Sequence, residues 1–308
     1  MKFVCAQPAE KFYTWQIEVM CRNFQKNGIN PSDQVILVGI KDGQIPKDWI
    51  KLKKGFPLVN FYFYEDDRTA RHYAPSIYFH LLKKHFQKSD QLHGETLFLH
   101  DCDMVFTRPT EFHRLESGSA WYLSDTNSYL NYDYIQTKGN DLYLTMCQVI
   151  GIDPVIPKLM NSNSGGAQYI VKNTDLKFWE KVEADSVALF DLFIYKEPEY
   201  IQKHDHDYPI QKWTAGMWSI LWNAWKAGHE TKVHKGLDFA WPTYNLNVIQ
   251  DYSILHNAGV INGNQGMFFK NDFWDKLPYF VDLDIDQTKA SAFYWNEIQD
   301  TAKNSVLI

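Results

Sequence analysis

The sequence lacks several features that would assign a chain quickly to a class of protein. Basic residues are not in excess, because 31 Lys and Arg stand against 37 Asp and Glu, for a net charge of −6. This balance argues against a protein that coats nucleic acid, which needs a basic field. No apolar run approaches the length of a membrane span, and the apolar start of "MKFVCAQPAEKFYTW" is too short for a secretion signal. We therefore expect a cytoplasmic protein with no membrane segment.

Cysteine pairs, internal repeats, low-complexity tracts and clear linkers are also missing. The 4 cysteines are scattered at Cys5, Cys21, Cys102 and Cys147, without the paired spacing of a zinc site or a disulfide framework. We expect them to be reduced and buried. What the chain does have is 45% hydrophobic and 16% aromatic residues, enough to build the core of one large domain.

Strand-like and helix-like segments alternate through the first third of the chain. The predicted strands are "KFVCAQP", "QVILVGI", "PLVNFYFYEDD", "ETLFLHDCDMVF" and "AWYLSD". Such alternation predicts an α/β fold with a mainly parallel, Rossmann-like sheet flanked by helices. Ligands of these sheets bind beyond the carboxyl ends of the strands. That rule places Gln7, Pro8, Asp66 and the segment from Asp101 to Asp103 along one edge.

The second half of the chain is less regular. An amphipathic helix is predicted from Thr174 or Asp175, either of which can cap it. A tryptophan-rich helix is predicted in "QKWTAGMWSILWNAWKAGHE", where Trp218, Trp222 and Trp225 have the spacing of a buried face.

Two aspartates stand one residue apart at the end of an apolar run in "FLHDCDMVFT". Side chains at positions i and i+2 of an extended strand point the same way, so Asp101 and Asp103 are expected to face one site. Two carboxylates this close are unfavourable unless a cation or hydrogen-bond donors neutralise them. Mn²⁺ or Mg²⁺ suits such a pair, particularly where diphosphate oxygens complete the coordination. The alternative is a solvated acidic turn, and the apolar residues on both sides argue against it.

A histidine near the end of the chain fits the same site. In "SILHNAGV", His256 can supply an imidazole ligand, and backbone N–H groups beside Asn257 and Gly259 can reach phosphate. The alternative is a structural histidine held by hydrogen bonds.

A glycine pair offers a second possible contact with a ligand. In "NSNSGGAQY", Gly165 and Gly166 would let the backbone approach a ligand closely, with Gln168 as a polar contact nearby. Taken alone, the loop is more typical of a plain tight turn than of a ligand contact.

Four segments carry a resemblance to a known family. In this order, "FLHDCDMVFTRP", "NSGGAQYIVKN", "KWTAGMWSILWNAW" and "LHNAGV" resemble a metal-dependent glycosyltransferase of the GT-A fold. The types that it resembles are the hydroxyproline O-arabinosyltransferases, the peptidyl-serine galactosyltransferases and similar bacterial and bacteriophage enzymes. The resemblance covers roughly residues 1–262. It implies a nucleotide-binding half over 1–130, a sugar and acceptor half over 131–262, and a C-terminal extension over 263–308 that packs on this single domain.

The resemblance also implies roles for particular residues. Asp101, Asp103 and His256 would hold Mn²⁺ or Mg²⁺ against the diphosphate of a nucleotide sugar, with uridine diphosphate (UDP) as the usual leaving group. The nucleoside pocket would lie at Gln7, Pro8 and Asp66. Glycosyl transfer develops negative charge on the leaving group, which the metal would stabilise as a Lewis acid.

One position departs from the family's pattern. Where relatives carry an acidic residue just before the Met of "WTAGMW", this chain has Gly216. A carboxylate there would be a natural general base for an acceptor hydroxyl. Asp125, and Asp205 or Asp207 in "KHDHDYP", are the candidate replacements, although the last two are more typical of a hydrated loop. The other possibilities are a retaining mechanism and an altered or inactive protein.

The acceptor is left open by the sequence. A protein hydroxyl, a glycan and a hydroxymethylated base of viral DNA all fit, and Trp213 and Trp218 are candidate contacts for the sugar or the acceptor. A DNA acceptor needs a basic groove and an extruded base, and "KLKK" and "LLKKHFQK" are more typical of solvated faces. The competing functions are a metal-dependent nucleotidyltransferase, although "CAQPAEKF" lacks a glycine-rich phosphate loop, and a nucleotide-sugar-binding protein without activity.

Overall fold

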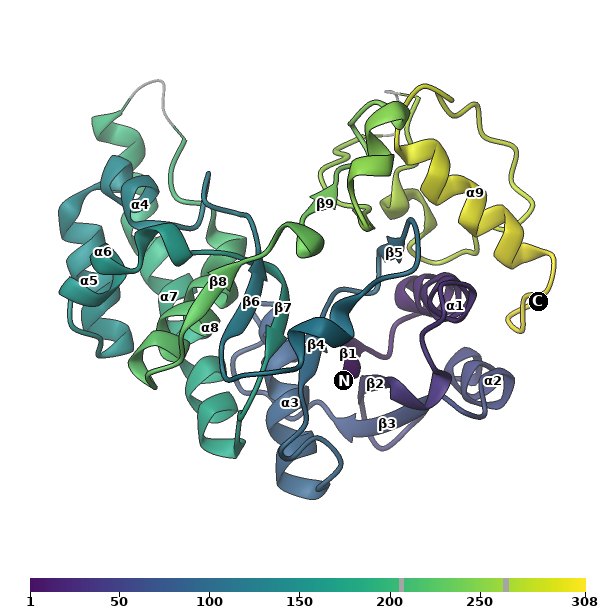
Figure 1. Cartoon of the computed structure of the whole chain (residues 1–308), viewed down its shortest axis with the longest axis horizontal. Coiled ribbons are helices and arrows are strands. Elements are labelled where there is room, and N and C mark those ends of the chain that lie inside the picture. The colour runs from purple at the N-terminus through teal and green to yellow at the C-terminus, as the bar shows by residue number, and fades with distance from the viewer. Residues whose placement is uncertain (205–207, 263–265) are drawn as a thin grey trace. The chain divides into compact units, whose positions relative to one another are not determined.

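The computed structural model describes residues 1–204, 208–262 and 266–308. Within this part of the chain, seven strands form the main sheet in the order β3-β2-β1-β4-β7-β6-β8, and three form a small sheet in the order β5-β10-β9 (Figure 1). The strands of the main sheet are β1 (Lys2–Pro8), β2 (Gln34–Ile40), β3 (Asn60–Glu65), β4 (Leu97–Leu99), β6 (Trp121–Ser124), β7 (Gly166–Val171) and β8 (Thr231–Val233). Those of the small sheet are β5 (Met104–Phe106), β9 (Phe239–Ala240) and β10 (Ile254–His256). The expectation of an α/β fold is confirmed.

Parallel pairing accounts for most of the main sheet. β1 pairs in parallel with β2, β2 with β3, and β6 with β8, whereas β6 and β7 are antiparallel. All seven residues of β2 are buried, as expected for a central strand covered on both faces. Pro8 lies opposite Gly39, and the backbone N–H of Asp66 donates to Ile40 O over 2.8 Å, so these strands end at a common carboxyl edge.

Helices supply the layers around the strands. They are α1 (Lys11–Lys26), α2 (Lys47–Gly55), α3 (Ser76–Lys88), α4 (Tyr132–Lys138), α5 (Asn140–Ile150), α6 (Val155–Leu159), α7 (Leu176–Lys203), α8 (Ala215–Lys226) and α9 (Ser291–Ala302). Asp175 caps α7, because its side chain accepts from the N–H of Phe178. Of the two predicted caps, Asp175 is therefore the one that is used. No helix in the described residues is both long enough and apolar enough to cross a membrane.

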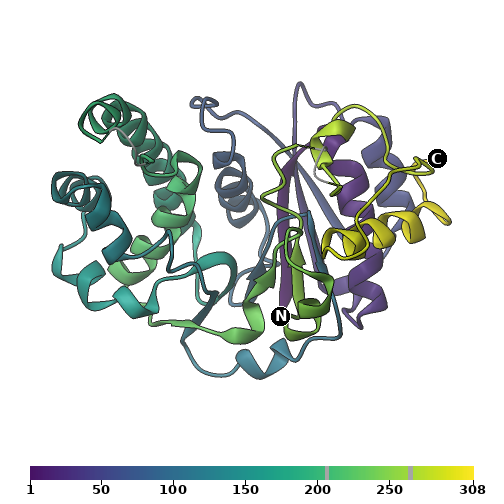
Figure 2. The ribbon, with the colours of Figure 1, turned by 90° about the horizontal axis from the view of Figure 1, so that it is seen from above.

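Two compact units divide the chain. Unit 1 contains Met1–Asp66, Leu99–Glu116 and Gly236–Ile308, and unit 2 contains Asp67–Phe98 and Ser117–Lys235. In unit 1 the C-terminal helix α9 packs beside α1, as Figures 1 and 2 both show. The first and last parts of the sequence therefore build one core. The predicted boundaries at residues 130 and 262 stay a prediction.

Unit 2 has its own core, in which α7 packs along both α3 and α8. Trp218 and Trp222 are fully buried there, with ring centroids 5.5 Å apart in an edge-to-face arrangement. The prediction that the tryptophan-rich helix faces a core is confirmed. Both units bury cysteine: all four thiols are buried and free of disulfides, as expected.

Candidate metal and donor site

The acidic pair lies in unit 1, in the turn that joins β4 to β5. Residues 101 to 103 are not part of a strand, so the expectation that strand alternation aligns Asp101 and Asp103 is wrong in its mechanism. The turn brings the two carboxylates together instead. It is fixed on one side by Cys102, whose buried Sγ lies 3.6 Å from Gln16 Oε1 of α1. On the other side His100 Nδ1 lies 3.0 Å from the carbonyl oxygen of Asp101.

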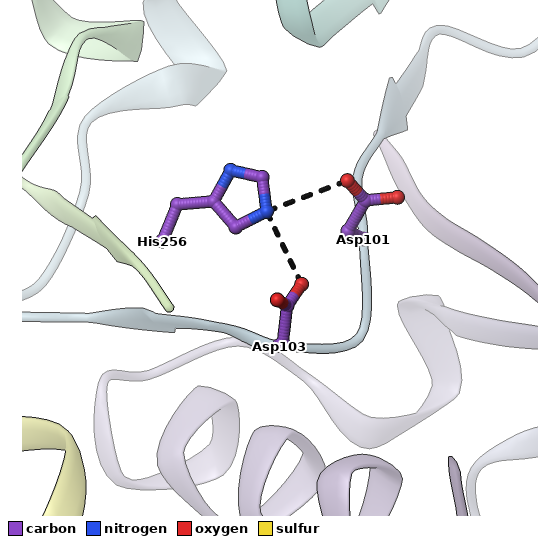
Figure 3. A group of neighbouring side chains, drawn as sticks. All are labelled: Asp101, Asp103 and His256. Carbon is purple, nitrogen blue, oxygen red and sulfur yellow. Dashed lines mark ion pairs between the residues drawn. The ribbon is translucent and has the colours of Figure 1, made fainter. Parts of the chain in front are cut away.

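Strand pairing brings the predicted histidine to this turn. β10 runs antiparallel to β5, with His256 opposite Met104, and the N–H of Asn257 donates to Asp103 O over 2.9 Å. The imidazole Nε2 then lies 3.2 Å from Asp103 Oδ1 and 3.4 Å from Asp101 Oδ2 (Figure 3). About 150 residues of sequence separate these groups, yet they form one cluster.

Two aromatic rings hold the imidazole of His256 in place. The Phe239 ring meets it edge-on with centroids 5.3 Å apart, and the Trp241 ring lies nearly parallel to it at 6.4 Å. Burial alone would lower the pKa of His256, but the carboxylates of Asp103 and Asp101 outweigh it and raise the pKa above its ordinary value.

A lysine that the sequence did not suggest completes the cluster. Lys270 Nζ forms an ion pair with Asp103 Oδ2, while Asp103 Oδ1 faces His256. Burial by itself would raise the pKa of Asp103, but Lys270 and His256 hold it well below its usual range. Asp103 is thus a buried carboxylate that stays charged, with a side chain only 5% exposed, whereas that of Asp101 is 49% exposed.

The donor set fits a divalent cation. One ligand atom each from Asp101, Asp103 and His256 lies within 4.8 Å of the others, and two carboxylates with an imidazole suit Mn²⁺. The spacings of 3.2 and 3.4 Å are close to the separation of about 3.0 Å between neighbouring ligands of an octahedral Mg²⁺. In addition, the buried Oδ1 of Asn257 has no hydrogen-bond partner within the described residues, as expected beside a ligand pocket.

The other residues assigned to the donor in unit 1 lie at the sheet edge or beside His256. Gln7 is buried, with its Nε2 3.5 Å from Cys5 Sγ, and Asp66 is buried where β3 ends. Pro8 ends β1 and is partly exposed. Gly259 has φ +82°, and a Cβ there would lie 3.1 Å from the Trp241 ring that stacks on His256. Glycine is needed at 259 for both reasons.

The glycine loop lies in unit 2, and packing explains both glycines. A Cβ on Gly165 would lie 2.5 Å from Ser124 O, and one on Gly166 would lie 2.6 Å from Tyr169 Oη. Gln168 is fully buried, and its N–H and Oε1 each lie 3.2 Å from Ser124 Oγ. The loop thus joins β7 tightly to β6. Its assignment to the donor stays a prediction.

The structure also explains the departure at position 216. A Cβ on Gly216 would lie 2.6 Å from the Phe79 ring and 3.1 Å from Tyr73 Oη. The Gly216 N–H donates to Tyr73 Oη over 2.8 Å. An acidic side chain would have no room here, so glycine at 216 is a packing requirement of unit 2.

The candidate bases and acceptor residues belong to unit 2 as well. Asp125 is exposed, and its carboxylate accepts from the N–H and Nδ2 of Asn127 over 2.9 and 3.0 Å. Asp205 and Asp207 lie outside the described residues. Trp213 is 54% exposed, but Trp218 is fully buried. The suggestion that Trp218 contacts sugar or acceptor is corrected, because its ring belongs to the core around Trp222.

Sequence reasoning missed Lys270 and Trp241. Lys270 lies in a 3₁₀ turn, Lys270–Phe273, within the segment that was expected to pack on the domain as a C-terminal extension. No fixed spacing connects it with the acidic pair, so only the fold could reveal it. Trp241, in "DFAWPTYN", could have been noticed as an aromatic residue close in sequence to His256, but nothing in the sequence indicates that the two rings stack.

Comparison with known proteins supports the fold. No known family model matches the chain, and no curated protein matches it in sequence. The apo structure of the bifunctional glycosyltransferase WbbM matches 99% of this chain with a TM-score of 0.50 and 9% identity. This chain spans about half of that structure, 50% of its length. The structure of the galactosyltransferase LgtC with donor and acceptor sugar analogs matches with a TM-score of 0.43 and 11% sequence identity. The match covers 97% of this chain and 96% of LgtC. The apo form of the glycosyltransferase GlyE of Streptococcus pneumoniae matches with a TM-score of 0.43 and 12% sequence identity. The match covers 100% of this chain and 62% of GlyE. The WbbM match, at a TM-score of 0.50, agrees with the α/β, GT-A-like fold.

Proposed function

We propose that this chain is a metal-dependent glycosyltransferase that moves a sugar from a UDP-linked donor to an acceptor hydroxyl. The observation that carries the proposal is the cluster of Asp101, Asp103 and His256 at the turn after β4. Two carboxylates and an imidazole at this spacing are a site for Mn²⁺ or Mg²⁺. The GT-A-like fold agrees with this use of the cluster. The hydroxyproline O-arabinosyltransferase type, the hexosyl or pentosyl class and a cytoplasmic location remain predictions.

Each residue of the cluster has a distinct task. The metal, when bound, would neutralise the charge that develops on the leaving diphosphate. Asp103 would bind it through Oδ1, because Lys270 already occupies Oδ2. His256 would bind it through Nε2 and must be neutral to do so, while Phe239 and Trp241 fix the plane of its ring. The more exposed Asp101 forms the solvent side of the cluster.

The catalytic base is a separate question, because Gly216 cannot be the position that supplies it. Asp125 is our candidate from the described residues, since its carboxylate is exposed in the loop after β6. Asp207 is the second candidate from the sequence. The stereochemical outcome of the transfer, inverting or retaining, is best determined directly from the anomer that forms.

Thermal unfolding in the presence of Mn²⁺ and a panel of nucleotides and nucleotide sugars tests the donor site. Binding to the native state raises the melting temperature, and a ligand at a hundred times its Kd adds about 2.7 kcal/mol. We expect a shift with UDP that requires Mn²⁺ and that Asp103→Ala abolishes. Asp300→Ala, which removes an exposed acid of unit 1 paired with Lys303, should retain it. No shift of the wild type with any donor would overturn the proposal.

Two further readouts separate this proposal from its competitors. Hydrolysis of the nucleotide sugar distinguishes an enzyme from a binding protein. The half of the donor that remains on the acceptor distinguishes a glycosyltransferase, which transfers the sugar, from a nucleotidyltransferase, which transfers the nucleotide.

A further inference from the structure

Unit 2 presents a tryptophan to solvent on a firmly held turn. Trp213 is 54% exposed, whereas six tryptophans of the described chain are almost completely buried. Its ring centroid lies 6.0 Å from that of Tyr129, with the planes inclined by 46°. Together the two rings form an aromatic surface, which we call the Trp213–Tyr129 platform. A single exposed aromatic residue is ordinary, so the surroundings of the platform decide its meaning.

The backbone beneath Trp213 is fixed from several sides. Tyr73, which is 1% exposed, donates from its hydroxyl to Trp213 O over 2.8 Å and accepts from the Gly216 N–H over 2.8 Å. The Thr214 hydroxyl donates to Gln211 O over 2.6 Å. This explains why position 216 is glycine, since a larger residue would meet Tyr73 and Phe79. A side chain that is held in advance loses little entropy when it binds a ligand.

Polar groups suited to hydroxyls flank the platform. The loop that carries Tyr129 also carries the exposed Asp125, and the Tyr129 N–H donates to Thr126 O over 3.0 Å. The buried Thr126 Oγ1 has no hydrogen-bond partner among the residues that the structure describes. A sugar ring has an apolar C–H face that packs on aromatic rings and hydroxyls that need carboxylate or amide partners.

The charge around the platform does not favour an anionic polymer. Lys212, the neighbour of Trp213, forms an ion pair with Glu197 over 2.5 Å. Its charge is therefore already neutralised, whereas binding of DNA relies on lysines and arginines that meet phosphates. The aromatic platform, the carboxylate of Asp125 and the neutralised Lys212 together suit an uncharged ligand that carries many hydroxyls.

We propose that the acceptor is a saccharide and that the Trp213–Tyr129 platform binds it in unit 2. The inference rests on the proposed glycosyltransferase function and narrows its acceptor to a glycan. Tyr73 and Gly216 act as positioning residues for the platform, because they hold the backbone of Trp213.

Direct binding of saccharides to the full-length protein tests the inference without any donor. Saturation-transfer NMR and calorimetry with a panel of methyl glycosides and disaccharides should identify a ligand for the wild type. Trp213→Ala should weaken its binding about tenfold, since stacking and the lost contact area are together worth about 1.4 kcal/mol. Trp213→Phe should retain most of the affinity. Trp274→Ala is the matched control, because Trp274 is similarly exposed at 52% but lies in unit 1.

Assays of sugar transfer then test whether Trp213 contributes to binding of the acceptor. Trp213→Ala should raise the acceptor KM about tenfold, whereas the matched Trp274→Ala variant should leave the acceptor KM unchanged. The inference is overturned if no saccharide binds, if Trp213→Ala binds as well as the wild type, or if only a peptide or DNA accepts the sugar. Saccharide binding that depends on Trp213, without any response to donor and Mn²⁺, would instead support the platform and reject the glycosyltransferase.

Discussion

Replacing Lys270 by Met should lower the stability of the metal-free protein more than that of the metal-loaded protein. In the metal-free protein Lys270 balances the charge of Asp103, a carboxylate that is 5% exposed. Removing one partner of a buried ion pair costs about 3–5 kcal/mol. Here His256 remains as a second partner and Lys270 is 28% exposed, so we expect a smaller loss of about 1–2 kcal/mol.

With Mn²⁺ bound, the metal balances the same carboxylate, and the loss should largely disappear. By linkage, Lys270→Met should therefore bind Mn²⁺ about 5–30-fold more tightly than the wild type. Chemical unfolding in EDTA and in saturating Mn²⁺, together with calorimetric titration of Mn²⁺, measures both effects. Lys276→Met is the control, because Lys276 is an exposed lysine of the same segment.

The reasoning would be refuted by an equal loss of stability in EDTA and in Mn²⁺. An unchanged or weaker affinity for Mn²⁺ in Lys270→Met would refute it as well. Either result would mean that the metal does not take over the charge that Lys270 balances on Asp103.

Three other changes test the packing and protonation described above. Gly216→Asp should lower the free energy of unfolding by about 2–4 kcal/mol without raising activity, because its side chain meets the Phe79 ring, and urea denaturation measures this. A Gly216→Asp protein as stable as the wild type and more active would contradict it. Burial lowers the pKa of His100 to about 4, below its unfolded value of about 6.5, so only the unfolded state gains this proton between these pH values. Stability should fall by about 3 kcal/mol as pH drops from 6.5 to 4, and His100→Gln, unlike the exposed His113→Gln, should flatten that slope. Trp218→Ala should lower the free energy of unfolding by about 3–5 kcal/mol, measured by thermal or urea denaturation. A change close to zero would contradict the burial of Trp218.

The sequence determined the class of fold and the ligands of the candidate metal site. The apolar run of β2 is buried along its whole length, as its composition requires. The predicted sheet exists because short, continuous apolar segments that alternate with helices are typical of strands covered on both faces. Asp101, Asp103 and His256 could be selected in advance because few residue types suit a hard cation, and enclosed carboxylates need a reason to stay charged.

Local reasoning was weaker wherever geometry depends on distant chain segments. Asp101 and Asp103 were expected to point the same way because they would alternate along a strand. A turn brings their carboxylates together instead. Gly165 and Gly166 suggested a ligand, but the space beside them is filled by Ser124 and Tyr169. A glycine indicates that something comes close, and the sequence does not state whether that is a ligand or another strand.

Only the tertiary structure decided what surrounds the acidic pair. Lys270 reaches Asp103 from 167 positions further along the chain, and the Phe239 and Trp241 rings fix His256 because β9 and β10 pair beside β5. It also decided that Trp213 is exposed while Trp218 is buried, although both belong to one tryptophan-rich segment. Residue type sets what a side chain can bind, whereas burial and the nearest charges depend on contacts between segments that the chain's order leaves far apart.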